Sequence, residues 1–341
     1  MPGPPSRFFL VGQTEARNGS ARILGTLTGG LLAAPLAVGA QQTRLYRIGV
    51  ILEGGPYAQA VEGLREGLQE LGLEEGKQLS LSVYDTKGRP KAVEIAAREF
   101  EGQGVDLIYT VTTSVTVATK RATKTVPIVF YCGSDPVAQG LAKSYRKPGG
   151  RLTGIHTQLT TLTAKRLEIL KEILPKAHRI IAFYDPENPA AQQSVMFARA
   201  AARQLKIELV ERQVASVEVL ANGLRKLRPG EVDALLYVSD AMVASQQATI
   251  IEIAREKRLP TIFQEPESVV HGALASYGVS FRLAGRLSAK IVQRILLGAN
   301  PGDLPIEQLN TLNFALNLKT AKALGLTIPP SLLQRADQVI E

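Results

Sequence analysis

The 341-residue chain has no tryptophan, a single cysteine (Cys132) and only three histidines, which lie far apart in the sequence. One cysteine excludes an internal disulfide bond and a cysteine-based zinc site. The scattered histidines argue against a histidine metal cluster, so the sequence predicts neither a metal ion nor a cofactor. Hydrophobic residues make up 45% of the chain, enough for one large core or two ordinary ones.

Motifs that mark common enzyme classes are also missing. The chain contains no G-x-S-x-G, no H-E-x-x-H and no G-x-G-x-x-G that opens a helix. "GLEEGKQ" (72–78) is one residue short of a phosphate-binding loop and fits a helix-to-strand turn better. Cys132 fits a small packed residue better than a nucleophile. We therefore predict no catalytic residue, although an exported hydrolase with a convergent site stays an alternative. The expected lack of a histidine at any strand end argues against that alternative.

The net charge of +9 raises the question of nucleic-acid binding. Lysines and arginines are scattered among acidic residues, and no run of five basic residues occurs. No helix-turn-helix pattern or zinc-finger spacing is present. We predict no nucleic-acid partner; a basic surface suits an anionic ligand or a membrane surface better.

The first forty residues resemble an export signal. Arg22 precedes an apolar run from Ile23 to Val38, and Val38-Gly39-Ala40 places small residues before a cleavage point. The 16-residue run is short for a membrane span, although a retained anchor is the alternative. We predict a cleaved signal peptide over residues 1–40 and a periplasmic location. Cleavage removes three arginines and one glutamate, which lowers the net charge from +9 to +7.

Strand-like and helix-like segments alternate after residue 45. Short apolar runs are followed by stretches with helical spacing, such as 57–72, where Val61, Leu64, Leu68 and Leu71 share one face. The expected strands are 46–55, 79–85, 105–111 and 126–132, and the expected helices are 57–72, 90–103 and 114–124. This alternation predicts an α/β fold with a doubly wound parallel sheet.

The same order of segments returns about 130 residues later. "HRIIAFYDPENPAAQQ" (178–193) echoes the segment at 46, "EVDALLYVSD" (231–240) echoes 104–113, and "RLPTIFQEPES" (258–268) echoes 125–135. Any two α/β units look alike to some degree, and that alternative stays open. Three matched pairs at offsets of 127 to 133 favour two similar lobes, each with its own sheet.

Small polar residues follow most of the predicted strands. Ligands of open parallel sheets bind outside the carboxyl ends of the strands, so these residues are the candidate binding site. Hydroxyls and helix N-termini suit a carboxylate, an acidic side chain suits an ammonium group, and tyrosines offer flat walls. The candidates are Gly55, Tyr57, Thr112, Thr113, Ser114, Ser134, Asp135, Asp185, Asn188, Ser239, Asp240 and Glu265, with Tyr131 and Tyr184 as further walls.

Each candidate also has an ordinary structural explanation. Thr113, Ser114 and Ser134 have the positions of helix N-caps, and Asp135-Pro136 and Asp185-Pro186 are common turn pairs. An N-cap can still line a pocket. For the ammonium group, Asp135, Asp240 and Glu265 stay equivalent choices at this point.

Several stretches resemble a known protein family. They are "GLREGLQELGLEEGK" (63–77), "VPIVFYCGSDPVAQGLA" (126–142), "KPGGRLTG" (147–154), "KRLEILKEILP" (165–175) and "NLKTAKALGLTIPPSLLQRADQVIE" (317–341). Together they resemble the periplasmic substrate-binding subunits of ABC transporters, of the family that includes tryptophan- and tyrosine-type binding proteins. The resemblance covers the chain from about residue 45 to its end. It departs from the family in the first loop, Glu53-Gly54-Gly55-Pro56-Tyr57, where the family is often serine-rich.

The resemblance implies a type I periplasmic-binding-protein fold, with two doubly wound parallel-sheet lobes joined by three crossing segments near 150–158, 276–282 and 303–310. It implies an N-terminal lobe of 45–155 plus about 282–305. The C-terminal lobe would hold 156–281 plus about 306–341. Tyr277, followed by Gly278, becomes a further candidate for the ligand site.

The implied function is capture of a small ligand, an amino acid or similar zwitterion, by closure of the two lobes. The partners implied are the permease and ATPase subunits of an ABC importer, with the binding protein itself a monomer. The alternative is a periplasmic sensor that presents its bound form to a membrane receptor.

Overall fold

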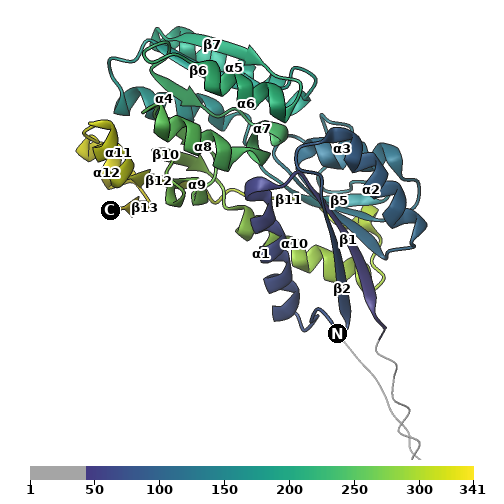
Figure 1. Cartoon of the computed structure of the whole chain (residues 1–341). Coiled ribbons are helices and arrows are strands. Elements are labelled where there is room, and N and C mark those ends of the chain that lie inside the picture. The colour runs from purple at the N-terminus through teal and green to yellow at the C-terminus, as the bar shows by residue number, and fades with distance from the viewer. Residues whose placement is uncertain (1–43) are drawn as a thin grey trace, which may run out of the picture. The chain divides into compact units, whose positions relative to one another are not determined.

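The computed structural model describes residues 44–341, and the predicted signal peptide lies outside this range. Two β-sheets organise the described chain, and we call each sheet with its helices a lobe (Figure 1). The first lobe contains β1 (Tyr46–Leu52), η1 (Gly55–Tyr57), α1 (Ala58–Glu70), β2 (Leu79–Asp85), α2 (Pro90–Gly102), β3 (Leu107–Val111), α3 (Thr113–Ala122), β4 (Ile128–Cys132), β5 (Leu152–His156), α10 (Phe281–Leu296), η2 (Pro301–Asp303) and β11 (Glu307–Gln308).

The second lobe is built mainly from the middle of the chain. It contains α4 (Leu162–Ile173), β6 (Arg179–Tyr184), α5 (Pro189–Leu205), β7 (Glu208–Gln213), α6 (Val217–Lys226), β8 (Ala234–Leu236), α7 (Ala241–Ser245), α8 (Gln247–Glu256), β9 (Thr261–Phe263), α9 (Glu267–Val270), β10 (Ala275–Gly278), β12 (Asn313–Asn317), α11 (Leu318–Leu324), α12 (Pro330–Arg335) and β13 (Gln338–Ile340). Within residues 44–341, no helix has both the length and the hydropathy that a membrane crossing requires.

The two sheets repeat one topology. The first has the strand order β11-β5-β4-β3-β1-β2, and the second has β13-β12-β10-β9-β8-β6-β7. Strands β1 to β5 therefore correspond to β6 to β10, and the sequence echoes between the two halves match the pairs β1/β6, β3/β8 and β4/β9. All pairs are parallel except β10 with β12. The predicted fold class of two parallel-sheet lobes is confirmed.

The chain passes between the lobes three times. It leaves the first sheet after β5, returns from β10 into α10, and leaves again between β11 and β12. The final crossing comes later than the sequence-based boundary at about residue 306, because β11 pairs with β5 at Glu307 and Gln308. The C-terminal strands β12 and β13 belong to the second sheet.

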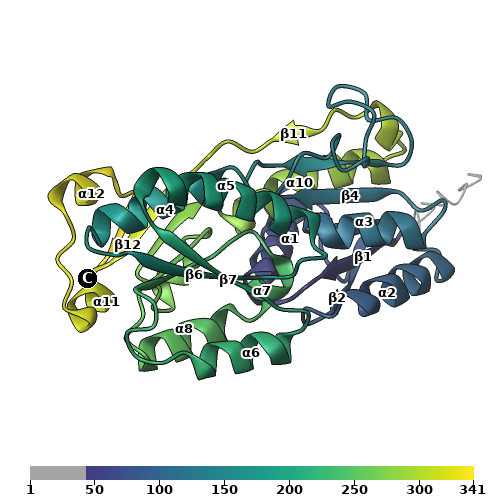
Figure 2. The ribbon, with the colours of Figure 1, turned by 90° about the horizontal axis from the view of Figure 1, so that it is seen from above.

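Alternating side chains of the central strands divide each lobe into two layers. On β1, Ile48 and Val50 pack with α1 in one cluster, whereas Ile51 packs with α2 and α3 in another. In the second lobe Ile181 faces the layer of α6 and α8, and Ile180 faces α4 and α5 (Figure 2). Strands β3 and β4 are buried along their whole length, as strands covered on both faces must be.

Helices α1 and α10 pack unusually closely because glycines line their contact. A Cβ atom at Gly63 would lie 1.8 Å from the carbonyl oxygen of Arg282, and one at Gly285 would lie 1.9 Å from that of Ala60. Only hydrogen fits at these positions. The contact fastens α10, which comes from late in the chain, onto the first lobe.

Candidate functional site

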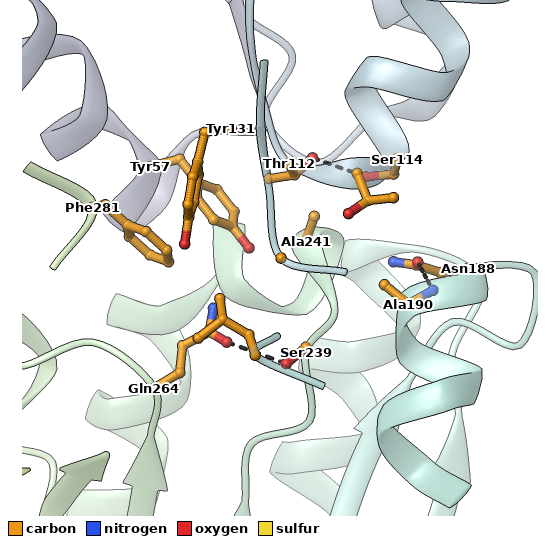
Figure 3. Close-up of a pocket in the computed structure, with 13 residues that line it drawn as sticks. Tyr57, Thr112, Ser114, Tyr131, Asn188, Ala190, Ser239, Ala241, Gln264 and Phe281 are labelled. Carbon is orange, nitrogen blue, oxygen red and sulfur yellow. Dashed lines mark hydrogen bonds between the residues drawn. The ribbon is translucent and has the colours of Figure 1, made fainter. Parts of the chain in front are cut away.

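A small space, here called the inner cavity, lies where the strand ends of the two lobes face each other (Figure 3). Its volume is about 30 Å³. Since one water needs about 10–15 Å³ by this measure, the inner cavity holds about two waters. It is lined by Tyr57, Thr112, Thr113, Ser114, Tyr131, Gly133, Leu159, Asn188, Ala190, Ser239, Ala241, Gln264 and Phe281.

The hydroxyl wall of the inner cavity comes from the start of α3. Thr112 caps this helix by accepting a hydrogen bond from the Val115 backbone N–H at 3.3 Å, and its hydroxyl lies 3.0 Å from that of Ser114. Thr112 has a φ of +93°, a conformation that a β-branched residue rarely adopts. Strain of this kind is concentrated at functional sites, where surrounding structure holds it in place. The sequence assigned helix N-cap positions to Thr113, Ser114 and Ser134, but the N-cap of α3 is Thr112, which also lines the inner cavity.

Aromatic rings fill most of the space beside this wall. Tyr57 and Phe281 have ring centroids 4.9 Å apart, and Tyr131 meets Phe281 edge-on at 5.8 Å. Figure 3 shows the three rings together on the first-lobe side of the cavity. The Tyr131 hydroxyl is buried and has no hydrogen-bond partner among the described residues. A buried hydroxyl without a partner is costly, so it is a group that a bound ligand could satisfy.

The wall from the second lobe is a hydrogen-bonded polar floor. Ser239 Oγ donates to Gln264 Oε1 at 3.3 Å, and Gln264 Nε2 lies 3.5 Å from the Tyr237 hydroxyl. The Tyr237 hydroxyl in turn donates to the Asp240 carbonyl at 2.8 Å. These contacts hold the Ser239 and Gln264 side chains in fixed directions at the cavity (Figure 3).

A fully buried arginine supports this floor from below. Arg166 on α4 donates to the Leu159 carbonyl, to Thr163 Oγ1 and, at 3.4 Å, to Ser239 Oγ, while its Nε has no partner. Burial lowers its pKa to about 10, against the opposing effect of Tyr237 and Glu265. The guanidinium is therefore charged at neutral pH and polarises the Ser239 hydroxyl.

A second and larger space, here called the outer cavity, adjoins the first. Its volume is about 350 Å³, within the range of ordinary small-molecule sites. Both lobes line it, and it shares Thr113, Ser114 and Asn188 with the inner cavity. The full lining is Glu53, Pro90, Val93, Thr113, Ser114, Val117, Ala118, Arg121, Gln139, Asp185, Glu187, Asn188, Pro189 and Met242.

Glu53 is the most perturbed acid on the outer cavity. Its side chain is only 3% exposed, and it accepts a hydrogen bond from Ser114 Oγ at 2.6 Å. Burial raises its pKa to about 7; the Ser114 hydrogen bond opposes this shift, and the charges of Asp240 and Asp185 add to it. Because those two acids belong to the second lobe, the two lobes bring like charges together at this point.

Seven of the predicted site residues line the inner cavity. They are Tyr57, Thr112, Thr113, Ser114, Tyr131, Asn188 and Ser239. Asp185 lines the outer cavity. Asn188 also caps α5, through hydrogen bonds from the Ala190 and Ala191 backbone N–H groups to its Oδ1.

The other candidates lie off both cavities. Gly55 touches the second lobe, where a Cβ atom would lie 2.7 Å from the Ala244 carbonyl oxygen. Ser134 sits behind Thr113, 2.9 Å from its hydroxyl. Tyr277 packs its ring edge-on against Phe314 at 6.3 Å, and its backbone carbonyl accepts a hydrogen bond from Arg166.

The three acids considered for an ammonium group have separate environments. Asp135 accepts from the Val137 and Ala138 backbone N–H groups in a turn. Burial raises its pKa, but hydrogen bonds from Tyr145 and the backbone outweigh burial and leave the pKa lowered. Asp240 caps α7, and burial raises its pKa to about 6.

Glu265 is sealed inside the second lobe. It is 1% exposed, its Oε1 has no partner among the described residues, and burial raises its pKa well above the usual range.

His156 corrects one further expectation, because a histidine does end a strand. It closes β5, stacks against Tyr145 at 4.8 Å and lines neither cavity.

The sequence analysis missed Glu53, Gln264, Phe281 and Arg166 as site residues. Glu53 and Gln264 stand directly after β1 and β9, so their position alone could have identified them. Phe281 opens α10 just after the chain has left β10 of the other lobe, and Arg166 lies inside a helix. No pattern in the sequence brings either of these two residues to the strand ends.

Comparison with known proteins places this geometry in context. The family model described as "ABC transporter substrate binding protein" matches residues 47–340. A tyrosine-binding protein of Clostridioides difficile is 26% identical over 324 residues, which cover 90% of this chain and 93% of that protein. These relatives are binding proteins and not enzymes, which agrees with the prediction of no catalytic site.

Two solved structures bear on the arrangement of the lobes. An ABC domain in complex with L-Trp from Streptococcus pneumonia has a TM-score of 0.77, with 26% identity over 87% of this chain and all of that chain. The ligand-free, open structure of a substrate-binding protein from Clostridium difficile has a TM-score of 0.57, with 26% identity over 87% of this chain and 99% of that one. At equal identity and equal coverage of this chain, the chain superposes better on the L-Trp complex than on the open, ligand-free structure.

Proposed function

Because the chain belongs to the family of ABC transporter substrate-binding proteins, we propose that it is the extracytoplasmic solute-binding subunit of an ABC importer. It captures a small zwitterion, an amino acid or a close analogue, between its lobes and delivers it to a membrane permease. The observation that carries the proposal is the pair of adjoining cavities at the facing strand ends, lined by side chains from both lobes.

Ligand capture occurs by closure of the lobes. A ligand favours the closed form only through contacts that the open form lacks, and residues from both lobes line both cavities. From the first lobe, the ligand carboxylate meets the start of α3 and the hydroxyls of Thr112, Thr113 and Ser114. From the second lobe, Ser239 and Asn188 complete the site. The relatives that bind tyrosine and L-Trp support an amino acid as ligand.

The proposal includes the setting of the protein. The mature chain begins after residue 40, works in the periplasm as a monomer, and contacts the permease of a complex that also contains ATPase subunits. We keep the predicted lobe limits except at the last crossing. The N-terminal lobe comprises 45–155 plus a second segment that was expected to span about 282–305 and now extends through β11. The C-terminal lobe comprises 156–281 plus the segment expected at about 306–341, which now begins after β11. The residues that stay predicted ligand residues without a place on either cavity are Gly55, Ser134, Asp135, Asp240, Glu265 and Tyr277.

A thermal-shift screen of residues 41–341 tests the proposal. The twenty amino acids, short carboxylates, sugars and polyamines are each added at millimolar concentration. A ligand at a hundred times its Kd stabilises by about 2.7 kcal/mol, which for a chain of this size is a shift of roughly 5 °C. A shift with an amino acid, accompanied by a smaller radius of gyration in X-ray scattering, supports the proposal. Silence across all four classes refutes it.

A further inference from the structure

Among the described residues that line the outer cavity, Glu53 is the one buried acid, and one of its two carboxylate oxygens has no hydrogen-bond donor. Ser114 donates to its Oε1, and no described residue donates to its Oε2. The side chain lines the outer cavity while being only 3% exposed. By contrast, Asp240 uses both oxygens, one for the Val243 backbone N–H and one for that of Asp185.

No cationic side chain of residues 44–341 forms a hydrogen bond or ion pair with Glu53. Among these residues, the one basic side chain that lines the outer cavity is Arg121, which is 72% exposed and paired with Glu94. The other acids on the cavity, Asp185 and Glu187, have the same sign as Glu53. A buried carboxylate without a partner is unfavourable, and proteins retain such groups where something else supplies the opposite charge.

We propose that Glu53, with Asp185 facing it from the second lobe, forms the ammonium subsite of the ligand-binding cleft. The inference rests on the proposed function and deepens it: the solute carries a primary or secondary amine, which enters the outer cavity and replaces the missing positive charge. The ammonium group bridges acids from both lobes, so its binding turns the repulsion between the lobes at this point into attraction. Apolar walls from Val93, Val117 and Met242 accommodate the carbon skeleton beside it.

The test uses matched probes and an isosteric variant. Each of the twenty amino acids is compared with its decarboxylated amine and its deaminated acid, in thermal shift and then in calorimetric titration. The proteins are the wild type, Glu53→Gln and the control Glu99→Gln, which changes an exposed acid on α2. Glutamine keeps an oxygen that can accept from Ser114 but removes the charge.

We expect at least one amine-bearing probe to stabilise the wild type and its deaminated partner not to. Glu53→Gln lowers the affinity for that probe at least tenfold, because a hydrogen bond to a charged group is lost. Glu99→Gln binds like the wild type. Unliganded Glu53→Gln melts at or above the wild-type temperature at pH 8, which shows that it folds.

Three results overturn the inference. They are binding of the deaminated acids as tight as that of the amino acids, unchanged affinity in Glu53→Gln, and stabilisation by Mg²⁺ or Ca²⁺ with no amine effect. If sugars or carboxylates alone bind and close the lobes, the ammonium subsite is refuted while solute capture stands. If no compound of any class binds, both are refuted.

Discussion

Gly55 is the point where closure of the lobes can be tested by adding one methyl group. A Cβ atom there would lie 2.7 Å from the Ala244 carbonyl oxygen and 2.9 Å from the Ser245 Cα, both in the opposite lobe. Real Cβ atoms essentially never lie within 3.0 Å of such atoms, and backbone atoms cannot move aside individually. Gly55→Ala should therefore disfavour the closed form specifically, because the obstructing atoms are absent when the lobes separate.

The magnitude follows from two separate effects. Overpacking costs about 1–3 kcal/mol, and since only the closed form is affected, the ligand Kd should rise about 5- to 150-fold. Gly55 also has a φ of +57°, where alanine is less stable than glycine by roughly 1–2 kcal/mol. That effect acts on the open and closed forms alike, so it lowers overall stability without changing affinity.

Gly76→Ala is the matched control. Gly76 has a φ of +84°, and a Cβ atom there would meet nothing within 4 Å. It should show the loss of stability without the loss of affinity. The comparison of the two variants isolates the contact between the lobes.

The assay combines calorimetry with a distance measurement. Spin labels on cysteines introduced at Glu99 and Glu252, one exposed position on each lobe, report the separation of the lobes by dipolar EPR. Cys132 will not be labelled, because it is fully buried and burial raises its pKa to about 12. With saturating ligand, Gly55→Ala should retain a population at the longer distance. Equal affinity and equal distances in the Gly55→Ala and Gly76→Ala proteins would refute this account of closure.

Three other outcomes are expected. Folding raises the pKa of Glu53 from 4.5 to about 7, so the folded state keeps this proton to a higher pH and the free energy of unfolding falls as pH rises from about 4.5 to 7. Glu53→Gln should remove about 3 kcal/mol of that fall, measured by urea titration of the unliganded protein at several pH values. The same dependence of unfolding free energy on pH in the wild type and the variant would contradict this. Gly63→Ala forces α10 away from α1 and should lower the free energy of unfolding by about 1–3 kcal/mol or more. The control Gly102→Ala, whose Cβ atom would meet nothing within 4 Å, should leave the protein as stable or more stable. Equal effects of the two substitutions would disprove the packing argument. Tyr131→Phe removes a buried hydroxyl without a partner, so thermal melts should show the free protein about 1 kcal/mol more stable while the ligand binds more weakly; a less stable free protein would mean that the hydroxyl is satisfied internally.

The sequence by itself determined the two lobes. Apolar runs such as 126–132 and helical spacing such as that of Leu64 and Leu68 are local patterns, and they gave the helix and strand order because each element must bury one face or both. The echo between 46–55 and 178–193 revealed the duplicated topology. The strand-end rule then indicated the region of the site, because parallel strands bring their carboxyl ends to one edge.

Only the tertiary structure decided which side chains at those edges face the ligand. Asp135, Asp240 and Glu53 are all acids near strand ends, and only Asp135 carries a local signal, the following Pro136 that is typical of a turn. Their difference lies in which backbone N–H groups reach them and which lobe covers them: Asp135 is used in a turn, Asp240 in a cap, and Glu53 is left open to the outer cavity. The burial and the electrostatic surroundings of Glu53 depend on the contact between the two lobes. Such contacts join residues that are far apart in the chain, and they leave no periodic pattern in the sequence.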